Sequence, residues 1–525
     1  MKIAIINTGG TISCVGNPLA PMSSAAFKAA SAIHLDPILK QTCPGLDLDY
    51  VTDLAFPESA SGMLDSTNLQ PSDWCLIARY ILEHYDEADG WVVLHGTDTM
   101  DFSGTALSML LGRFRADGTA LAQLSKPVIL TGSQVPLFHA DQAGIITGMS
   151  FNTDAFQNVC GAVAAAATGL AGLYVFFNSH LMRGSRVVKT DANQFHGFTS
   201  PNFPDVGQYG ITLTLDARNA LPFPLSDAVS LDHPTARAAT LAQLQAIFDR
   251  LDQVPVMQLN AFPAWYRPEA GTALLANLIR AVTAEGIRGL VLEAYGEGNF
   301  PSGNPNEPEK GAIARALKEA ADQGVVIVDN TQVLKGAVDY NAYAAGAWLP
   351  GIGALNPADM TPMASLAKLT VLLAAQDFNG WTAEDLRYLM QVPLVGEMQD
   401  GSRLDSRMRP VMLPGQALTT FTGGATLNNL PAHGPVLSDA AGHILWAMLE
   451  QQDAAALPGR LLLKEDGNLI FYSRNGKVLW QSGTTSSGTG ATLLSLRQNE
   501  GDKTIRLAIT CQITGKVMWE KTVSM

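Results

Sequence analysis

The chain has 525 residues, which is enough for two to four domains and a large buried core. Hydrophobic residues make up 47% and charged residues 16%, a balance typical of a globular protein rather than a disordered one. The net charge of −14, from 34 basic and 48 acidic residues, argues against nucleic acid or an anionic membrane as the main partner.

The first predicted element is a buried strand over residues 3–6, which runs straight into the glycine turn Thr8–Ile12. Adjacent glycines let the backbone turn tightly and approach a ligand, so we expect Thr11 to be presented at the end of the strand. A plain turn is the alternative interpretation. The turn lacks the lysine of a phosphate-binding loop, and the apolar run before it is too short for a signal peptide.

A second strand also ends in side chains that can do chemistry. Residues 91–94 are all apolar and indicate a strand buried on both faces, and a helix is predicted to follow it. Between the two lie Thr97, Asp98 and Thr99. They are expected either to cap the helix or to contact a small ligand at the carboxyl end of the strand.

The pattern of strand, turn and helix recurs along the chain and predicts an α/β fold with parallel sheets. The segment Asp65–Asn68 is expected to cap a helix over residues 71–85, and residues 183–190 indicate a hairpin-like pair that ends in Lys189. Residues 216–235, rich in proline and polar side chains, predict a linker before a second α/β unit. The elements expected from the linker onward are a helix over 236–252, strands over 289–292 and 325–328, and helices over 311–322 and 366–375.

From about residue 411 the chain changes to short strands rich in glycine, serine and threonine. One pattern, a glycine turn, apolar residues and a tryptophan, occurs at residues 442–446, 476–480 and 515–519. The repeat predicts three β units that meet at a shared aromatic core formed by their tryptophans.

Cysteine usage points to a reducing compartment. The five cysteines are scattered and form no Cys-x-x-Cys pair, so free thiols in the cytoplasm and no zinc site are expected. No apolar stretch is long enough to cross a membrane, and no His, Cys and carboxylate cluster has metal-ligand spacing. We therefore predict no metal, no cofactor and no membrane partner.

Several hydroxyl and charged side chains fall at or just beyond the ends of predicted strands. They are Thr11, Ser66, Thr97, Asp98, Ser133 and Lys189. A neutral hydroxyl is a poor nucleophile and needs a base, a role that a positioned lysine can take beside a carboxylate. A Thr–Lys–Asp set therefore fits acyl transfer, although the aspartate could instead hold a substrate ammonium group. His95, next to the apolar strand, is predicted to be structural.

Together, Thr8–Ile12 and His95–Thr99 resemble the two motifs of the bacterial-type L-asparaginase/glutaminase family, nearest to its cytoplasmic, type I members. The resemblance covers about residues 1–400. It implies hydrolysis of L-asparagine to L-aspartate and ammonia through an acyl-enzyme, in a homodimer or homotetramer.

The resemblance also implies roles for individual residues. Thr11 matches the nucleophile, whereas Thr97, Asp98 and Lys189 match a second triad. The matches to substrate-binding positions are Ser66 for the α-carboxylate, with Thr67 beside it, Asp98 for the α-ammonium, Ser133 for the side-chain amide, and Asn299 for the site of the neighbouring subunit. Leu19 stands where the family usually has a tyrosine beside the nucleophile, and a leucine cannot relay a proton.

The carboxyl-terminal part resembles the bulb-type mannose-binding lectins, which form a three-sided β-prism. Asp466, Asn468 and Tyr472 match their sugar-binding pattern, whereas Lys464 replaces its glutamine. A structural or assembly role is therefore expected for this part of the chain, and the alternative, a glycan site, is limited to the middle repeat.

The predicted organisation is two parallel-sheet α/β domains followed by an all-β prism. The expected divisions are an active-site domain over 1–215, a linker and helix over 216–253, a second α/β domain over 254–400 and the lectin-like domain over 411–525. The alternative function is a carbohydrate- or partner-binding protein on a weakened amidase scaffold, or an enzyme for another ω-amide such as glutamine.

Overall fold

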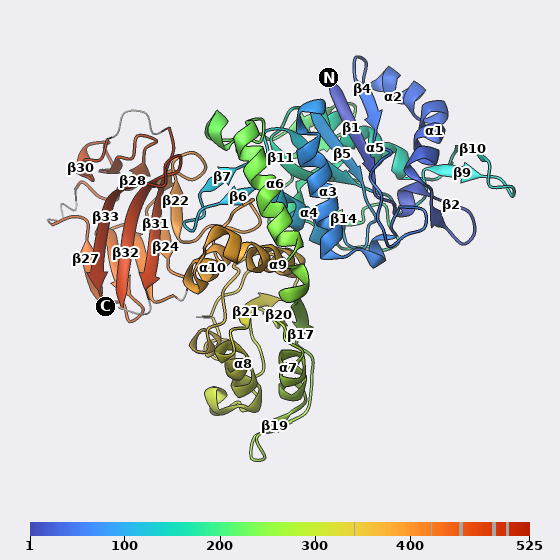
Figure 1. Cartoon of the computed structure of the whole chain (residues 1–525). Helices are drawn as coiled ribbons and strands as arrows, with labels where there is room; N and C mark the ends of the chain where they lie inside the picture. Colours follow the sequence, from blue (N-terminus) through green and yellow to red (C-terminus); the bar gives the residue numbers. More distant parts are fainter. Residues whose placement is uncertain (341, 422, 451–454, 486–489, 500–502) are drawn as a thin grey trace.

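The computed structural model describes the whole chain apart from residues 341, 422, 451–454, 486–489 and 500–502. Two α/β units with parallel sheets are followed by three antiparallel sheets at the carboxyl end (Figure 1). The α/β fold and the parallel sheets predicted from the sequence are confirmed.

The first sheet has eight strands, in the order β16-β15-β12-β11-β8-β5-β1-β4. Five strands are parallel: β1 (Lys2–Asn7), β4 (Asp47–Tyr50), β5 (Gly90–Leu94), β8 (Pro127–Thr131) and β11 (Gly172–Phe177). The other three add antiparallel at one edge: β12 (His180–Arg183), β15 (Gly207–Tyr209) and β16 (Leu213–Leu215). Because β5, β8 and β11 are buried along their whole length, both faces of the sheet are covered.

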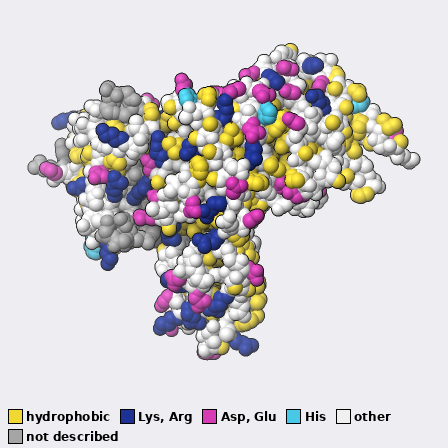
Figure 2. All heavy atoms as spheres, viewed as in Figure 1, with side chains coloured by type: hydrophobic (Ala, Val, Ile, Leu, Met, Phe, Trp, Pro, Cys, Tyr) yellow, Lys and Arg dark blue, Asp and Glu magenta, His cyan; other side chains and the backbone are white. Residues whose placement is uncertain are grey.

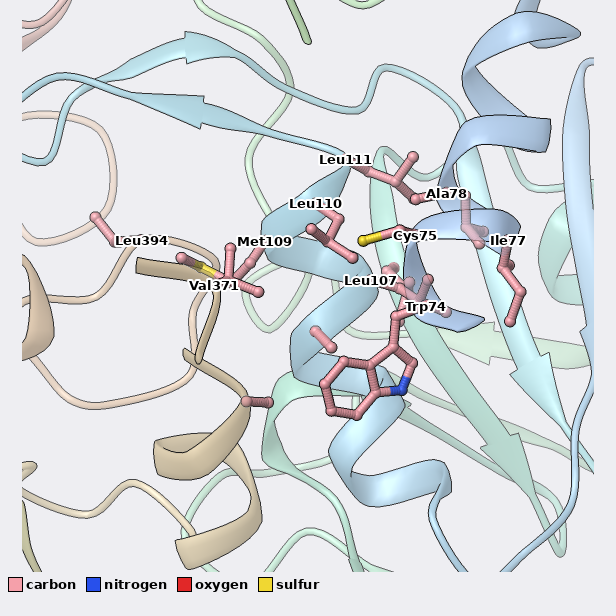
Figure 3. Packing of buried hydrophobic residues seen from close by; sticks show 14 of the residues in the cluster. Trp74, Cys75, Ile77, Ala78, Leu107, Met109, Leu110, Leu111, Val371 and Leu394 are labelled. Atoms are coloured by element: carbon pink, nitrogen blue, oxygen red, sulfur yellow. The ribbon is translucent and has the colours of Figure 1, made fainter. Parts of the chain in front are cut away.

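Helices cover both faces of this sheet. One face carries α1 (Ser24–His34), α2 (Asp36–Thr42) and α5 (Ala155–Ala166), and the other α3 (Pro71–Glu83) and α4 (Met100–Leu110). Figure 3 shows Trp74 and Cys75 of α3 beside Leu107 and Leu110 of α4, with Val371 of α9 (Pro362–Asn379) nearby. This core also includes α6 (Pro234–Phe248), so the two α/β units share buried surface.

The second sheet is smaller and wholly parallel. It consists of β17 (Val256–Asn260), β20 (Gly289–Ala294) and β21 (Val326–Thr331), in that order. Its helices are α7 (Leu274–Ala284), α8 (Ala312–Asp322), α9 and α10 (Ala383–Met390). Short hairpins complete the α/β part: β2–β3 (Cys14–Val15, Ala20–Pro21), β6–β7 (Arg113–Phe114, Ala120–Ala122), β9–β10 (Phe138–Ala140, Ile146–Met149), β13–β14 (Val188–Lys189, Phe198–Thr199) and β18–β19 (Tyr266–Arg267, Thr272–Ala273).

The carboxyl-terminal part contains three four-stranded antiparallel sheets. Each has one strand from the short segment 403–419 at its edge: β22 (Arg403–Asp405), β23 (Val411–Met412) or β24 (Ala417–Thr419). In the first of these three sheets, β22 is followed by β31 (Thr492–Asn499), β32 (Thr504–Cys511) and β33 (Val517–Ser524). In the second, β23 is followed by β28 (Arg460–Leu463), β29 (Leu469–Tyr472) and β30 (Val478–Gln481). In the third, β24 is followed by β25 (Ala425–Leu430), β26 (Gly434–Asp439) and β27 (Ile444–Ala447). One segment therefore connects all three sheets.

The repeated tryptophans lie on β27, β30 and β33 and contact one another. The ring centroids of Trp446 and Trp480 are 6.3 Å apart, those of Trp480 and Trp519 are 5.9 Å apart, and those of Trp446 and Trp519 are 6.5 Å apart. The tilted and edge-on geometries are those that aromatic rings favour. The shared aromatic core predicted from the repeat is confirmed.

The hairpin predicted over residues 183–190 is wrong. Asn178 and Ser179, with φ of 46° and 69°, form a two-residue turn that pairs β12 with β11. Two consecutive positive φ values suit the right-handed twist of a tight hairpin. Lys189, on β13, pairs instead with Phe198 of β14.

The cap predicted over Asp65–Asn68 is wrong, and of the two interpretations of Thr97 and Asp98 the helix cap is not the one observed. Helix α4 begins after Thr99, which makes no side-chain cap hydrogen bond, and Thr97 and Asp98 contact a lysine instead. The segment Asp65–Asn68 forms its own turn of 3₁₀ helix, whereas α3 is capped by Gln70 and Asp73. A reciprocal cap at Gln70 leaves the earlier segment free to contact the glycine turns.

Candidate active site

Three turns meet at the carboxyl edge of the first sheet. Gly10 donates a backbone hydrogen bond to the carbonyl oxygen of Leu64 at 2.9 Å. A Cβ on Gly10 would lie 2.3 Å from the Cα of Gly96, and a Cβ on Gly96 would lie 2.3 Å from the Oγ of Ser66. Such approaches leave no room for a larger residue. The turn that carries Thr11 therefore packs directly on the turn that carries Thr97.

Lys189 connects the second of these turns to β13. Its Nζ lies 2.8 Å from the Oγ1 of Thr97 and 2.5 Å from the Oδ1 of Asp98. Thr97 is buried, whereas the side chain of Asp98 is 54% exposed and reaches solvent. In its neutral form the amine can accept a proton from the threonine hydroxyl, while the carboxylate holds it in place.

Asp101 was missed by the sequence analysis, because its place in the first turn of α4 is also that of an ordinary helix residue. Its Oδ2 accepts a hydrogen bond from the backbone nitrogen of Lys189 at 3.1 Å, so it anchors β13 beside the site. Burial raises the pKa of Asp101 to about 6. A close backbone contact adds to the anchor, since a Cβ on Gly104 would lie 2.0 Å from the carbonyl oxygen of Gly184.

His95 is a structural residue, as predicted. Its Nδ1 donates to the carbonyl oxygen of Gly96 at 2.7 Å, and its Nε2 accepts from the hydroxyl of Ser103 at 3.0 Å. The indole nitrogen of Trp74 donates to the same serine at 2.9 Å. Full burial lowers the pKa of His95 to about 4. The neutral ring thus fixes the turn that carries Thr97.

Ser66, Thr67 and Ser133 lie on the neighbouring turns. Ser66 Oγ accepts the backbone N–H of Asp98 at 3.3 Å, and Thr67 Oγ1 donates to Asp65 at 2.6 Å. Ser133 is buried and its hydroxyl donates to the carbonyl oxygen of Val135 at 2.6 Å. The lone pairs of its oxygen therefore remain available to accept a hydrogen bond.

Comparison with known protein families gives matches over most of the α/β part. The Asparaginase N-terminal family model matches residues 2–220, and the Glutaminase/Asparaginase C-terminal domain model matches residues 272–387. L-asparaginase 1 of Escherichia coli K12 is 32% identical over 337 residues, an alignment that covers 64% of this chain and 82% of the relative. The chain belongs to the L-asparaginase family.

Solved structures agree with this assignment of the asparaginase fold. The thermostable L-asparaginase from Thermococcus kodakarensis is 28% identical with a TM-score of 0.55, covering 76% of this chain and 99% of that structure. L-asparaginase I from Vibrio cholerae is also 28% identical, with a TM-score of 0.54 and the same coverage. These similarities leave about a quarter of this asparaginase-family chain unmatched.

Asn299 lies in the other α/β unit of this asparaginase-family chain. It follows β20, and the backbone nitrogen and oxygen of Asn299 both pair with Tyr295. The structure thus places it in the turn at the carboxyl end of the second sheet, not on the turns that carry Thr11, Thr97 and Ser66.

The three lectin-like residues already have partners within the chain. Asp466 accepts from the Nζ of Lys464 at 2.8 Å, and the Asn468 amide donates to Gln481 and accepts from Ser482. The guanidinium of Arg460 lies over the ring of Tyr472, 5.6 Å from its centre. Each of the three side chains therefore has a contact within the chain.

Two kinds of feature are absent from the described part of the chain. Among those residues, no three or more His, Cys, Asp or Glu side chains are grouped so that they could hold a metal ion. Within the same residues, no helix has both the length and the apolarity needed to cross a membrane.

Proposed function

We propose that this chain hydrolyses L-asparagine to L-aspartate and ammonia, with the turns around Thr11, Thr97 and Lys189 as its active site. The observation that carries the proposal is the contact of Lys189 with both Thr97 and Asp98, found in a chain of the asparaginase family. No cofactor is needed, because hydroxyl, amine and carboxylate groups together can carry out acyl transfer.

The proposed reaction has two steps. The hydroxyl oxygen of Thr11 attacks the side-chain amide carbon, the C–N bond breaks, and ammonia leaves with the transferred proton. Water then attacks the resulting ester on Thr11, which releases L-aspartate and restores the hydroxyl. Neutral Lys189 takes the hydroxyl proton of Thr97 and returns it, so that Thr97 can relay a proton to or from the reacting groups.

The remaining groups are proposed to hold the substrate. Ser66 and Thr67 would bind its α-carboxylate, and the exposed carboxylate of Asp98 would bind its α-ammonium. The oxygen of Ser133, whose proton is donated to Val135, would accept a hydrogen bond from the amide NH₂. Asn299, on the second sheet, would complete the site of a neighbouring subunit in a homodimer or homotetramer.

We further propose that the domains of the chain divide at 1–215, 216–253, 254–400 and 411–525. We also propose that the last of them is a bulb-lectin-like prism and that the protein is cytoplasmic. Three antiparallel sheets around three tryptophans support the prism, and five unpaired cysteines support the location. Because Asp466 and Asn468 are engaged within the chain, a structural role for the tail is favoured over glycan binding.

The test of the proposed function is ammonia release by the purified protein from L-asparagine and, separately, from L-glutamine. We expect release from L-asparagine, with the ratio of the two kcat/KM values defining the substrate preference. Absence of release from both amides would refute the proposal. Binding of mannose together with that absence would support the carbohydrate-binding alternative.

Leu19 offers a second test of the site. It lies in the β2–β3 hairpin that follows Thr11, with 54% of its surface exposed, and it has no proton to transfer. A Leu19→Tyr variant should raise kcat by about 10²-fold, the lower range for a positioned acid–base group. Leu19→Phe is the matched control, because it adds the ring without the hydroxyl. Equal kcat values in the two variants would contradict the assignment of this position.

A further inference from the structure

A cavity of about 620 Å³ lies where the carboxyl-terminal sheets meet the first α/β unit. Its walls come from the end of α4, the start of β11, the segment 393–409 and the tail residues Leu493 and Gln512. The volume is that of a site for a small organic molecule.

This cavity is separate from the proposed active site. Thr97 and Asp98 precede the amino end of α4, whereas Ser108 and Leu111 line the cavity at the other end of the helix. Eleven residues of helix span about 16 Å. The cavity also lies at the amino end of β11, whereas the turns around Thr97 follow the carboxyl ends of the parallel strands.

The cavity is strongly basic although the chain as a whole is acidic. Only two aspartates line it, Asp400 and Asp405. The six arginines that line it are Arg183, Arg186, Arg218, Arg403, Arg407 and Arg409. Figure 2 shows Lys and Arg side chains on the carboxyl-terminal sheets and at their boundary with the rest of the chain.

Three of these arginines have a carboxylate partner. They are Arg186 with Asp359, Arg218 with Asp216, and Arg403 with Asp400. The other three donate only to backbone carbonyls in the described part of the chain: Arg183 to Asn219 and Ala220, Arg407 to Phe223, and Arg409 to Asp400. Among the described residues, none of these three guanidinium groups forms an ion pair with a carboxylate, and the six arginines of the lining outnumber its two aspartates.

Arg183 is the most informative of the three. It is 7% exposed, and its guanidinium lies over the ring of Phe203, 3.9 Å from the ring centre. Burial, and then the nearby charge of Arg186, lower the pKa of Arg183 to about 10. Its hydrogen bonds go to uncharged carbonyl groups, and a buried charge with no paired carboxylate is costly, so an anion in the cavity would reduce that cost.

Much of the remaining lining is apolar, so a ligand of this cavity would need an apolar part as well as an acidic group. The apolar lining includes Leu111, Phe114, Leu173, Leu221, Leu394 and Met398. We propose that this cavity binds a small organic anion, namely a carboxylate or phosphate ester attached to an apolar body. The acidic group would pair with Arg183, Arg407 and Arg409, and the apolar body would pack on the leucines.

The test uses the full chain and the fluorescent anion 8-anilinonaphthalene-1-sulfonate, with displacement by 3-phenylpropionate, phenyl phosphate or neutral 3-phenylpropanol. We expect the dye to bind and either anion to displace it, with phenylpropanol much weaker. Displacement by only one anion would identify the acidic group. Because a hydrogen bond to a charged group contributes about 1.5–3 kcal/mol, Arg183→Met should raise the Kd of the dye by about tenfold or more.

Arg407→Gln is a second variant, chosen because Arg407 is half-buried and its removal is easier to accommodate in the fold. It should weaken dye binding as well. The control is Arg280→Met, which removes an exposed arginine that pairs with Glu319 and does not line the cavity, and it should leave dye binding unchanged. Absence of dye binding, equal binding by wild type, Arg183→Met and Arg407→Gln, or equal displacement by phenylpropanol would each overturn the proposal.

Discussion

Replacing Thr11 or Thr97 by alanine is expected to lower the kcat for L-asparagine by at least about 10³-fold, with KM changed much less. In the proposed mechanism the two hydroxyls act on the reacting bonds, whereas substrate affinity comes from other side chains. Ammonia release under saturating L-asparagine measures the effect. Because residues that act as a unit are not additive, the double variant should be little worse than either single variant.

The controls for this experiment lie within the site or next to it. Thr97→Ser retains the hydroxyl that Lys189 contacts and should recover much of the lost rate. Thr190→Ala removes an exposed threonine next to Lys189 and should leave kcat near the wild-type value. If Thr11→Ala and Thr97→Ala both kept wild-type rates, the assignment of both hydroxyls would be wrong, even if the protein proved to be an asparaginase.

The second large effect is expected on stability. Lys368 of α9 and Glu397 are both fully buried, and their charged atoms are 2.6 Å apart. Lys368 also donates to the carbonyl oxygen of Val392, and Glu397 accepts from the backbone nitrogens of Leu394 and Val395. Lys368→Met leaves a buried carboxylate without its partner, so the free energy of unfolding should fall by about 3–5 kcal/mol.

Urea unfolding followed by circular dichroism measures this loss. The matched control is Lys318→Met, which removes an exposed lysine paired with Asp322 one helical turn away and should change the midpoint little. Adding Glu397→Leu to Lys368→Met should restore part of the stability, because no unpaired charge then remains in the core. A single variant as stable as Lys318→Met would contradict the role of the buried pair.

The elements with a strong local pattern could be predicted from the sequence. The apolar run at 91–94 is β5, and the strand–turn–helix order around it is correct because burial on both faces leaves a continuous hydrophobic signal. The repeat of tryptophans likewise predicts their contact, since three copies of one pattern imply equivalent positions.

Features that depend on distant partners could not be predicted in this way. Lys189 was assigned to a local hairpin, yet its strand is β13, and its backbone is held by Asp101 from another turn. For Thr97 and Asp98 the sequence leaves two interpretations open, a helix cap and a part of a Thr–Lys–Asp set, and the position of Lys189 in the fold favours the second. Arg183 shows the same limit, because the cavity beside it is completed by tail residues about 300 positions later.

The segment 403–419, which supplies an edge strand to each of the three carboxyl-terminal sheets, has a consequence for how the protein is made. During synthesis β22 leaves the ribosome before the strand with which it pairs, β31, some 90 residues later. In contrast, β24 is followed directly by its partner β25. The three sheets should therefore form in the order in which their strands are translated, and the sheet that contains β22 should form last. Until then Arg403 and its neighbours cannot complete the wall of the cavity.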